Sequence, residues 1–421
     1  MIERIRGEVL GRLDQTRELT DEEIRACIDE VIVQYSKSEY MPLAVRGRIR
    51  KGVFDSLRRL DVLQELLEDG EITEIMVNGC EDIFVERGGR IEKLDRHFAS
   101  RERLSDVIQL MVAKVNRRVN EASPIVDSRL EDGSRVNIVL NPIALNGPIV
   151  TVRKFPKKPV TMDMLIAWEA VSIEAVEMLR DIVRAGYNIV VCGGTGSGKT
   201  TFLNAMSDFI PKEERIITIE DSAELQIKGA PNLVRMETRN ATADGEHSIS
   251  IRDLIRTSLR MRPDRIIVGE VRGEEAVDLL QSMNTGHDGA MSSGHSNSSI
   301  DMLRRLETMV LMGMDMPIQA IRGQITSAVD ILVHLGRLRD RSRRVLEIAE
   351  VLPLKDGDYR LNRIFWFEET GQEEGRIIGR LSGGRERLKD KKKLIMAGIR
   401  WEPSGTAEGS GSVSSDSMAV L

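Results

Sequence analysis

A run of eight residues in the middle of the chain has the residue types that bind polyphosphates. It fits the pattern G-x-x-x-x-G-K-[ST], whose glycines let the backbone curl until successive N–H groups point at phosphate oxygens. A helix that begins at such a loop adds about half a positive charge. Lys199 would supply a mobile cation for the β- and γ-phosphates, and Thr200 a hydroxyl for Mg²⁺. The predicted phosphate-binding residues are Gly193, Gly194, Thr195, Gly196, Ser197, Gly198, Lys199, Thr200 and Thr201.

The sequence around this loop predicts a strand before it and a helix after it. Residues 189–191 are a short all-apolar run, typical of a strand buried on both faces, and residues 201–207 have a helical pattern. Residues 216–219 and 266–268 are runs of the same kind, with helical patterns between them. This repetition predicts a doubly wound α/β domain with a parallel sheet and right-handed crossovers. The alternative is an ordinary glycine-rich turn between a strand and a helix.

Carboxylates follow two of the predicted strands. Glu220 and Glu224 come after the first strand, and Glu270 comes after the second. Because the carboxyl ends of parallel strands line the ligand crevice, these side chains could hold Mg²⁺ through water or poise a nucleophilic water. Glu270 is the candidate for orienting or deprotonating that water. Its strand lacks an acidic residue, so Thr200 and Glu270, with water, are the predicted metal-binding residues. For Glu220 and Glu224 the alternative is a helix N-terminus that favours acids.

Two histidines and several arginines are further candidates. His287 and His295 lie eight residues apart in Gly/Ser-rich sequence, where they could sense the γ-phosphate; no cysteine or third histidine joins them as in a metal site. The alternative is a histidine that stabilises a turn. Arg272 lies in an arginine-rich stretch, whereas Arg135 and Arg153 lie upstream near predicted strand ends. An arginine from another domain or subunit could neutralise transition-state charge, and structural ion pairing is the alternative.

The order of the sequence patterns divides the chain into five parts. Residues 1–69 are predicted to be helical, and residues 70–155 to form a compact α+β domain. A proline-flanked linker is predicted at 156–162, followed by the α/β domain at 163–370. Residues 371–421 are basic and then Ser/Gly-rich, which predicts a disordered tail.

Composition excludes several classes of protein. The 421 residues include 41 % hydrophobic residues and carry a net charge of −6, which argues against global disorder and against polyanion binding on charge alone. Three widely spaced cysteines do not form a disulfide framework, and this favours a reducing compartment. No stretch of about 18 apolar residues occurs, so we expect any contact with a membrane to be peripheral.

Four blocks in this order resemble the secretion ATPases of type II and type IV systems: the phosphate loop at 193–200, the acidic box at 220–224, residues 259–273, and the histidine box at 285–297. Within that superfamily the chain is most similar to the CpaF-type ATPases of tight-adherence (Flp/Tad) pilus assembly. Three upstream segments carry that similarity, namely residues 72–79, 127–136 and 151–155. At the second histidine this chain has Ser-Gly-His-Ser-Asn-Ser, where the family usually has Thr-x-His-Ala-Asn-Ser.

The resemblance implies a RecA-like motor domain, a smaller N-terminal domain that closes over the nucleotide, and a homohexameric ring. It also implies ATP with Mg²⁺, and a cytoplasmic protein attached to the inner face of the membrane through a platform protein. By matching position, Glu270 would be the catalytic glutamate and His295 the second histidine-box residue. Arg135 and Arg153 would be the N-terminal-domain arginines that reach the phosphates. The acidic-box members would be Glu220 and Glu224.

The expected function is that of an ATP-hydrolysing motor that powers pilus assembly or protein secretion. A nucleic-acid translocase or helicase is the alternative, because RecA-like folds also host such motors. The acidic charge and an aromatic content of 4 % argue against it, so no nucleic-acid partner is expected. The basic run at 385–393 is the one contrary feature. A nucleotide-gated scaffold would need a damaged site, and the phosphate loop and Glu270 both look intact.

Overall fold

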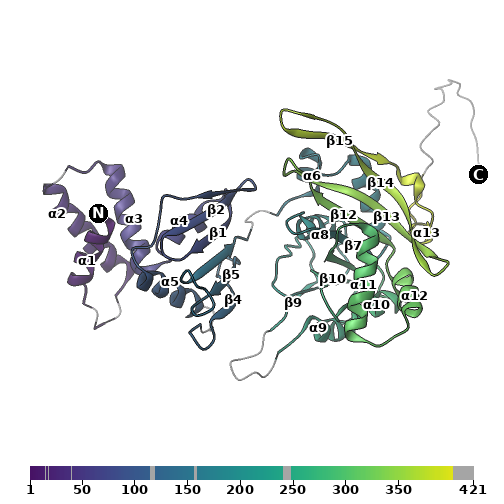
Figure 1. Ribbon diagram of the computed structural model, residues 1–421, viewed down its shortest axis with the longest axis horizontal. Coiled ribbons are helices and arrows are strands. Elements are labelled where there is room, and N and C mark those ends of the chain that lie inside the picture. The colour runs from purple at the N-terminus through teal and green to yellow at the C-terminus, as the bar shows by residue number, and fades with distance from the viewer. Residues whose placement is uncertain are drawn as a thin grey trace, which may run out of the picture. The chain divides into compact units, whose positions relative to one another are not determined.

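The computed structural model describes residues 1–14, 16–17, 19–38, 40–113, 119–155, 159–239 and 248–401 (Figure 1). The chain divides into two compact units, Met1–Lys158 and Pro159–Leu421. The division falls inside the segment that the sequence predicts as a linker. Within the described ranges, no helix combines the length and apolar character that crossing a membrane requires.

The N-terminal unit begins with three helices around one apolar core. They are α1 (Ile2–Arg12), α2 (Asp21–Ser38) and α3 (Leu43–Arg58). A capping box begins α2, because Thr20 N donates to Glu23 Oε2 at 2.8 Å and Glu23 N donates to Thr20 Oγ1 at 3.3 Å. Ile28 and Val31 of α2 are fully buried in this core.

A fourth helix and an antiparallel sheet complete the N-terminal unit. The elements are α4 (Val62–Glu68), β1 (Ile72–Asn78), β2 (Asp82–Arg87), β3 (Arg90–Lys93), α5 (Arg101–Ala113), β4 (Ile125–Arg129), β5 (Arg135–Val139) and β6 (Ile149–Arg153). The strand order is β3-β2-β1-β6-β5-β4. Leu63 and Leu66 of α4 share the core of this sheet. The predicted helical character of residues 1–69 extends through α4, whose leucines join the core of the sheet while the helix also contacts α3.

The C-terminal unit is built on a nine-stranded sheet in the order β15-β14-β13-β12-β7-β11-β10-β8-β9. Its strands are β7 (Ile189–Gly193), β8 (Ile216–Glu220), β9 (Leu233–Glu237), β10 (Arg265–Val268), β11 (Met291–His295), β12 (Ile331–Arg337), β13 (Arg343–Lys355), β14 (Asp358–Glu373) and β15 (Arg376–Gly383). Strands β12, β7, β11, β10, β8 and β9 are parallel, and β13 to β15 extend the sheet with antiparallel pairing.

Helices cover both faces of the parallel part. They are α6 (Met162–Ala167), α7 (Ile173–Arg184), α8 (Lys199–Ser207), α9 (Ile251–Ser258), α10 (Ala276–Asn284), α11 (Ser299–Gly313) and α12 (Ile318–Ala328). Ile189 and Val191 of β7 pack with α6–α8, whereas Val190 and Cys192 pack with α9–α12. Successive side chains of a strand point to opposite faces, so an all-apolar strand needs helices on both sides. This confirms the predicted RecA-like, doubly wound α/β domain.

Residues 371–401 are folded against the C-terminal unit, which overturns the predicted disordered tail for this stretch. After β15 the chain forms a short 3₁₀ helix (Arg385–Arg387) and α13 (Lys392–Met396). Leu388 and Leu394 are each 2 % exposed in the core beside α7. Tyr187 Oη donates to the carbonyl of Asp390 at 2.7 Å. Charge counts along the sequence missed this packing because two leucines among many lysines carry it; residues 402–421 lie outside the described residues.

We expect Leu394→Ala to lower the free energy of unfolding by about 2–5 kcal/mol, because it empties a filled position in the core. The adjacent Ile395 is 72 % exposed in the same helix, so Ile395→Ala should change stability by about 0.5 kcal/mol or less. Urea unfolding followed by circular dichroism measures both variants. Equal, negligible effects would mean that this segment is not part of the folded core in solution.

Candidate functional site

The predicted phosphate loop joins the end of β7 to the start of α8. Gly193 has φ 152°, and a Cβ there would lie 2.2 Å from the carbonyl oxygen of Leu335 on β12, so only glycine fits. Gly198 has φ 93° and is the N-cap of α8, where the first amides of the helix have no intrahelical acceptor. Ser197 Oγ is buried and forms no hydrogen bond within the described chain. The loop therefore offers the amide cradle that a phosphate group requires.

Lys199 is folded back onto the loop that precedes it. Its side chain is largely buried, and Nζ donates to the carbonyls of Gly193 at 3.2 Å and Gly194 at 3.0 Å. The same nitrogen lies 3.2 Å from Nδ1 of His295, the last residue of β11. An ammonium group only donates hydrogen bonds, so Nδ1 of His295 must accept. The ammonium charge of Lys199 is thus held beside the first residues of the phosphate loop.

His295 connects Lys199 to Glu270. With Nδ1 as acceptor, a neutral ring carries its proton on Nε2, which lies 2.9 Å from Oε1 of Glu270. Burial lowers the pKa of His295, and the nearby charge of Lys199 lowers it further. Both effects favour the neutral imidazole with its proton on Nε2, which faces Glu270. Oε1 of Glu270 accepts no hydrogen bond within the described chain, so the two groups are close but not aligned for one.

Glu270 is held as a carboxylate. Burial is the largest influence and alone would raise its pKa, but the hydrogen bond from Arg272 and the charges of Arg272 and Lys199 outweigh burial, so the pKa lies below its ordinary value. Arg272 Nη2 donates to Glu270 Oε2 at 2.7 Å. A half-buried carboxylate that stays ionised near a phosphate loop has the protonation state that a general base requires.

Hydrogen bonds between neighbouring loops fix the three elements at one edge of the sheet. The backbone N–H of Val271 donates to Ser293 O at 2.9 Å, and Ser293 Oγ donates to Gly269 O at 2.8 Å. The N–H of Ser296 donates to the carbonyl of Gly193 at 3.3 Å. These bonds tie the segments of Glu270 and His295 to each other and to the phosphate loop. All three lie at the carboxyl ends of parallel strands, where the sequence predicted the site.

Glu220 supports the loop after β8. The side chain is 2 % exposed, and Oε2 accepts the backbone N–H groups of Glu224 at 2.7 Å and Leu225 at 2.9 Å. Burial raises the pKa of Glu220 despite these two hydrogen bonds. Oε1 is buried and accepts no hydrogen bond within the described chain. The structure thus assigns Glu220 a positioning contact, while direct roles for Glu220 and Glu224 in catalysis stay predictions.

His287 lies away from the phosphate loop of its own chain, contrary to the prediction. It precedes β11, whose first residue pairs with the first residue of β7, whereas the phosphate loop follows the last residue of β7. A five-residue strand spans roughly 13 Å, so the two histidines lie at opposite edges of the sheet. Nδ1 of His287 lies 3.5 Å from Thr285 Oγ1, as in a turn-stabilising histidine. The sequence spacing alone could not show that a whole strand separates His287 from His295.

Arg135 and Arg153 are brought side by side in the N-terminal unit. They are direct cross-strand partners on β5 and β6, and Glu74 of β1 lies on the other side of Arg153. Arg153 Nε is 3.9 Å from Glu74 Oε1. Like charges placed directly opposite each other destabilise a sheet, which fits a surface that binds an anion. Contact between these arginines and a nucleotide stays a prediction.

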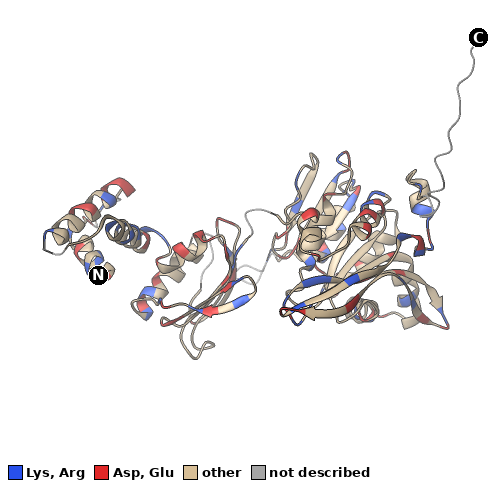
Figure 2. Cartoon of the chain, turned by 90° about the horizontal axis from the view of Figure 1, so that it is seen from above, with Lys and Arg blue, Asp and Glu red and all other residues tan. Residues whose placement is uncertain are grey.

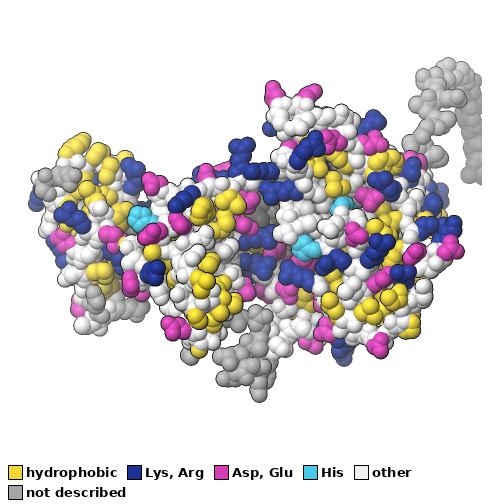
Figure 3. Space-filling view, in the orientation of Figure 1, with side chains coloured by type: hydrophobic (Ala, Val, Ile, Leu, Met, Phe, Trp, Pro, Cys, Tyr) yellow, Lys and Arg dark blue, Asp and Glu magenta, His cyan; other side chains and the backbone are white. Residues whose placement is uncertain are grey.

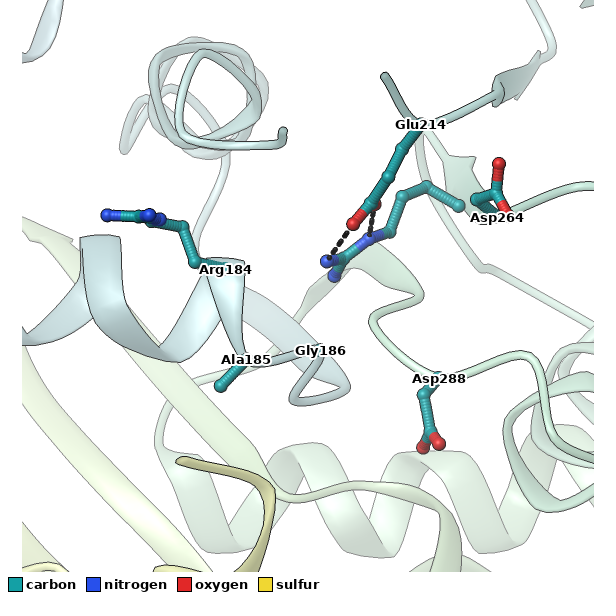
Figure 4. Close-up of a pocket in the computed structure, with 7 residues that line it drawn as sticks. Arg184, Ala185, Gly186, Glu214, Asp264 and Asp288 are labelled. Atoms are coloured by element: carbon teal, nitrogen blue, oxygen red, sulfur yellow. Dashed lines mark hydrogen bonds and ion pairs between the residues drawn. The ribbon is translucent and has the colours of Figure 1, made fainter. Parts of the chain in front are cut away.

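A cavity of about 280 Å³ lies at the edge of the sheet remote from the phosphate loop. It is lined by Arg184 at the end of α7, by Arg265 at the start of β10, and by Glu214 and Asp288. Figure 4 shows Arg184 directed away from Glu214, whose carboxylate binds the Arg265 guanidinium. Because its lining residues lie at the amino ends of β10 and β11, this cavity is no part of the phosphate site.

Sequence analysis missed one residue that touches the phosphate loop. Arg343, the first residue of β13, donates from Nε to the carbonyl of Gly196 at 2.8 Å. It lies 147 positions after Gly196, and only the pairing of β12 with both β7 and β13 brings the two together. In the sequence Arg343 is only an arginine close to an apolar run, and that pattern is too common to single out a site.

The family model described as "Type II/IV secretion system protein" matches residues 57–380. The chain belongs to this family. It is 35 % identical over 323 residues to a putative conjugal transfer protein of Mycobacterium tuberculosis (strain CDC 1551 / Oshkosh), covering 74 % of this chain and 90 % of the relative. It is also 32 % identical over 305 residues to the type IV secretion system protein VirB11 of Brucella suis biovar 1, covering 66 % and 84 %. The predicted superfamily is confirmed, and the CpaF-type assignment stays a prediction.

Solved structures of similar chains include the VirB11 ATPase of the Brucella suis type IV secretion system in complex with sulphate. That chain is 29 % identical, with a TM-score of 0.37, over 68 % of this chain and 91 % of the other. A second is the pilus retraction motor PilT with bound ADP, at 22 % identity and a TM-score of 0.49, over 72 % and 81 %.

The residues at the loop fit a magnesium–nucleotide complex. Among the described residues there is no cluster of three or more acidic, histidine or cysteine side chains that could hold a metal alone. Mg²⁺ in nucleotide sites keeps water and phosphate ligands and needs only one or two from the protein. Thr200, half-buried in the first turn of α8, and Glu270 could supply these. The orphaned Ser197 Oγ and the glycine cradle fit the phosphates.

Proposed function

We propose that this chain hydrolyses ATP to ADP and phosphate with Mg²⁺, as a motor of a pilus or secretion system. The proposal is carried by a series of three side-chain contacts, from Lys199 to His295, from His295 to Glu270 and from Glu270 to Arg272. These contacts connect the phosphate loop to an ionised glutamate. Membership of the type II/IV secretion system family supports the role in transport. The names of the relatives, which include conjugal transfer and type IV secretion proteins, support it further.

In this proposal each residue has one task. The loop amides and Lys199 bind the β- and γ-phosphates, and Thr200 holds the metal, which supplies charge neutralisation on the phosphate oxygens. Glu270 accepts a proton from the water that attacks the γ-phosphorus. The bond from that phosphorus to the β–γ bridging oxygen breaks, and ADP leaves. His295, held between Lys199 and Glu270, would report the presence of the γ-phosphate to both.

The contacts at the start of the C-terminal unit support nucleotide-driven movement of the N-terminal unit. Arg343 on β13 touches the phosphate loop, and its neighbour Arg344 donates to the carbonyl of Glu169 at 2.8 Å. Val345 N donates to Ala170 O at 2.8 Å. Glu169 and Ala170 follow α6, the first helix after the linker. A change in the loop would thus reach the segment that leads to the N-terminal unit, where Arg135 and Arg153 are proposed to meet the phosphates.

The finer parts of the proposal rest on the sequence resemblance. They are a homohexameric ring, the CpaF-type role in tight-adherence pilus assembly, and cytoplasmic placement on an inner-membrane platform protein. The experiment that tests the function is phosphate release from MgATP by the purified full chain, with native mass spectrometry with and without ATP. Release of phosphate by a six-chain species supports the proposal. Failure to bind or hydrolyse MgATP would overturn it.

The basic run at 385–393 is the one feature that favours a nucleic-acid translocase or helicase, and its contacts in the structure argue against that function. In the basic run 385–393, Lys393 Nζ pairs with Asp288 at 2.7 Å and Asp330 at 2.8 Å. Glu350 accepts the backbone N–H groups of Lys389 and Asp390 at 3.0 and 2.7 Å. The side chain of Lys393 and the backbone of Lys389 and Asp390 are therefore already engaged in contacts within the C-terminal unit. Acidic and basic residues are also interspersed along the ribbon of each unit (Figure 2), and side chains of both charges lie on the visible surface of each unit (Figure 3).

We expect Arg272→Gln to shift the acid limb of the pH–rate profile to higher pH. Glu270 must be ionised to accept a proton, and its Arg272 hydrogen bond is the largest influence that lowers its pKa. Without that bond, burial raises the pKa, so activity is lost earlier as the pH falls. Rates of phosphate release from about pH 4 upward measure the shift, because the ordinary glutamate pKa is about 4.3 and that of the parent Glu270 lies below it. An unchanged acid limb with a uniformly lower rate would contradict this electrostatic role.

A further inference from the structure

Arg343 is the charged residue at the phosphate loop whose role neither the motif nor the family match explains. Its Nε donates to Gly196 O at 2.8 Å, and Cδ would lie 3.5 Å from a Cβ placed on Gly198. The side chain thus runs along the loop from one glycine to the other. Both glycines have positive φ, 70° and 93°, so the arginine lies over the two points where the loop bends most.

The register of the sheet explains how a distant strand reaches the loop. Leu335 of β12 is paired with Gly193, and Arg337 at the end of β12 is paired with Arg343 at the start of β13. Two strand spacings amount to roughly 10 Å, which an extended arginine largely spans. β12 runs parallel to β7 and ends at the carboxyl edge, so the turn after it places the first residue of β13 at that edge, where the nucleotide is proposed to bind.

Structural ion pairing does not account for Arg343. Other arginines of this hairpin region have carboxylate partners: Arg339 pairs with Glu369, Arg344 with Glu169, and Arg363 with Glu347. Across the described ranges, the Arg343 side chain has no acidic partner, and Gly196 O accepts its one hydrogen bond. Once Nε is fixed, the planar guanidinium has a defined orientation, and four N–H donors remain on its terminal nitrogens.

We propose that Arg343 is a second phosphate-binding cation of the same chain, acting beside Lys199. It holds Gly196 in the curl that presents the loop amides, and its charge attracts the triphosphate tail. A guanidinium suits this task because it binds a carbonyl edge-on while its remaining donors face phosphate oxygens. This inference rests on the proposed ATPase function and adds a binding residue from outside the phosphate-loop motif.

Two substitutions separate the charge from the loop contact. In Arg343→Gln the amide nitrogen lies the same number of bonds from the backbone as Nε, so the bond to Gly196 O can persist without the charge. In Arg343→Met both are lost while the stem remains. Arg339→Gln is the matched control, because Arg339 is an exposed arginine of the same hairpin turn whose partner is Glu369.

The test is calorimetric binding of MgADP and of inorganic tripolyphosphate to the full chain and its variants. We expect Arg343→Met to weaken tripolyphosphate binding about tenfold and Arg343→Gln about threefold, with a smaller salt dependence and unchanged thermal unfolding. Arg339→Gln should bind as the parent protein does. Variants that bind tripolyphosphate within a factor of about 1.5 of the parent would overturn the proposal, as would a loss for MgADP alone.

These outcomes can be distinguished from failure of the proposed function itself. If the unmodified chain binds neither MgATP nor tripolyphosphate, the ATPase proposal fails and the role of Arg343 fails with it. If the unmodified chain binds and hydrolyses MgATP while Arg343→Met retains full affinity for tripolyphosphate, only the role of Arg343 fails.

Discussion

Glu270→Gln should bind MgATP and hydrolyse it about 10²–10⁴-fold more slowly than the parent protein, the range that general base catalysis supplies. The amide keeps the shape of the side chain and can still accept the hydrogen bond from Arg272, so the site should not collapse. It cannot take a proton from the attacking water. Removing a negative charge beside the triphosphate should leave affinity equal or slightly higher.

Two measurements check this prediction: steady-state phosphate release and titration with a fluorescent nucleotide. Glu177→Gln is the matched control, because Glu177 is exposed on α7 and its change should alter neither quantity. A turnover close to that of the parent protein would show that another group activates the water. Loss of nucleotide binding together with turnover would instead assign Glu270 to the binding of the metal.

Lys199→Met should weaken MgATP binding by about 100-fold, the equivalent of about 3 kcal/mol, and abolish turnover at ordinary nucleotide concentrations. Methionine retains the apolar stem, which matters because Lys199 is only 7 % exposed. The ammonium group donates to the carbonyls of Gly193 and Gly194, and a bound phosphate would compete for the same donors.

A second readout distinguishes lost chemistry from lost structure. The charge of Lys199 is one cause of the lowered pKa of His295, so the variant should show a higher pKa for that ring by NMR titration. Thermal unfolding should stay close to that of the parent, and Lys212→Met on the exposed loop before β8 serves as the control. Retention of full MgATP affinity by Lys199→Met would contradict the assignment of the phosphate loop.

The sequence alone determined the local features whose causes lie within a few residues. The four glycines and Lys199 specify a phosphate loop because the backbone conformation and the charge are both encoded there. The all-apolar residues 189–191 specify a strand covered on both faces, because no polar side chain is present to face water. Ser172 and Thr20 cap their helices for an equally local reason, because a cap needs only a hydroxyl within reach of the next amides.

Only the tertiary structure decided which of these features meet. Strand order placed His295 beside Lys199 and left His287 at the opposite edge, although eight residues separate the two histidines. The pairing of β12 with β7 and β13 also brings Arg343 to Gly196. Leu394 is buried in the core although the residues around it in the sequence are basic. Hydrogen bonds between strands and the burial of apolar faces select these long-range pairings. Neither can be recognised from the spacing of residues along the chain. The sequence therefore predicted the candidate residues, and the tertiary structure determined which of them lie together in the site.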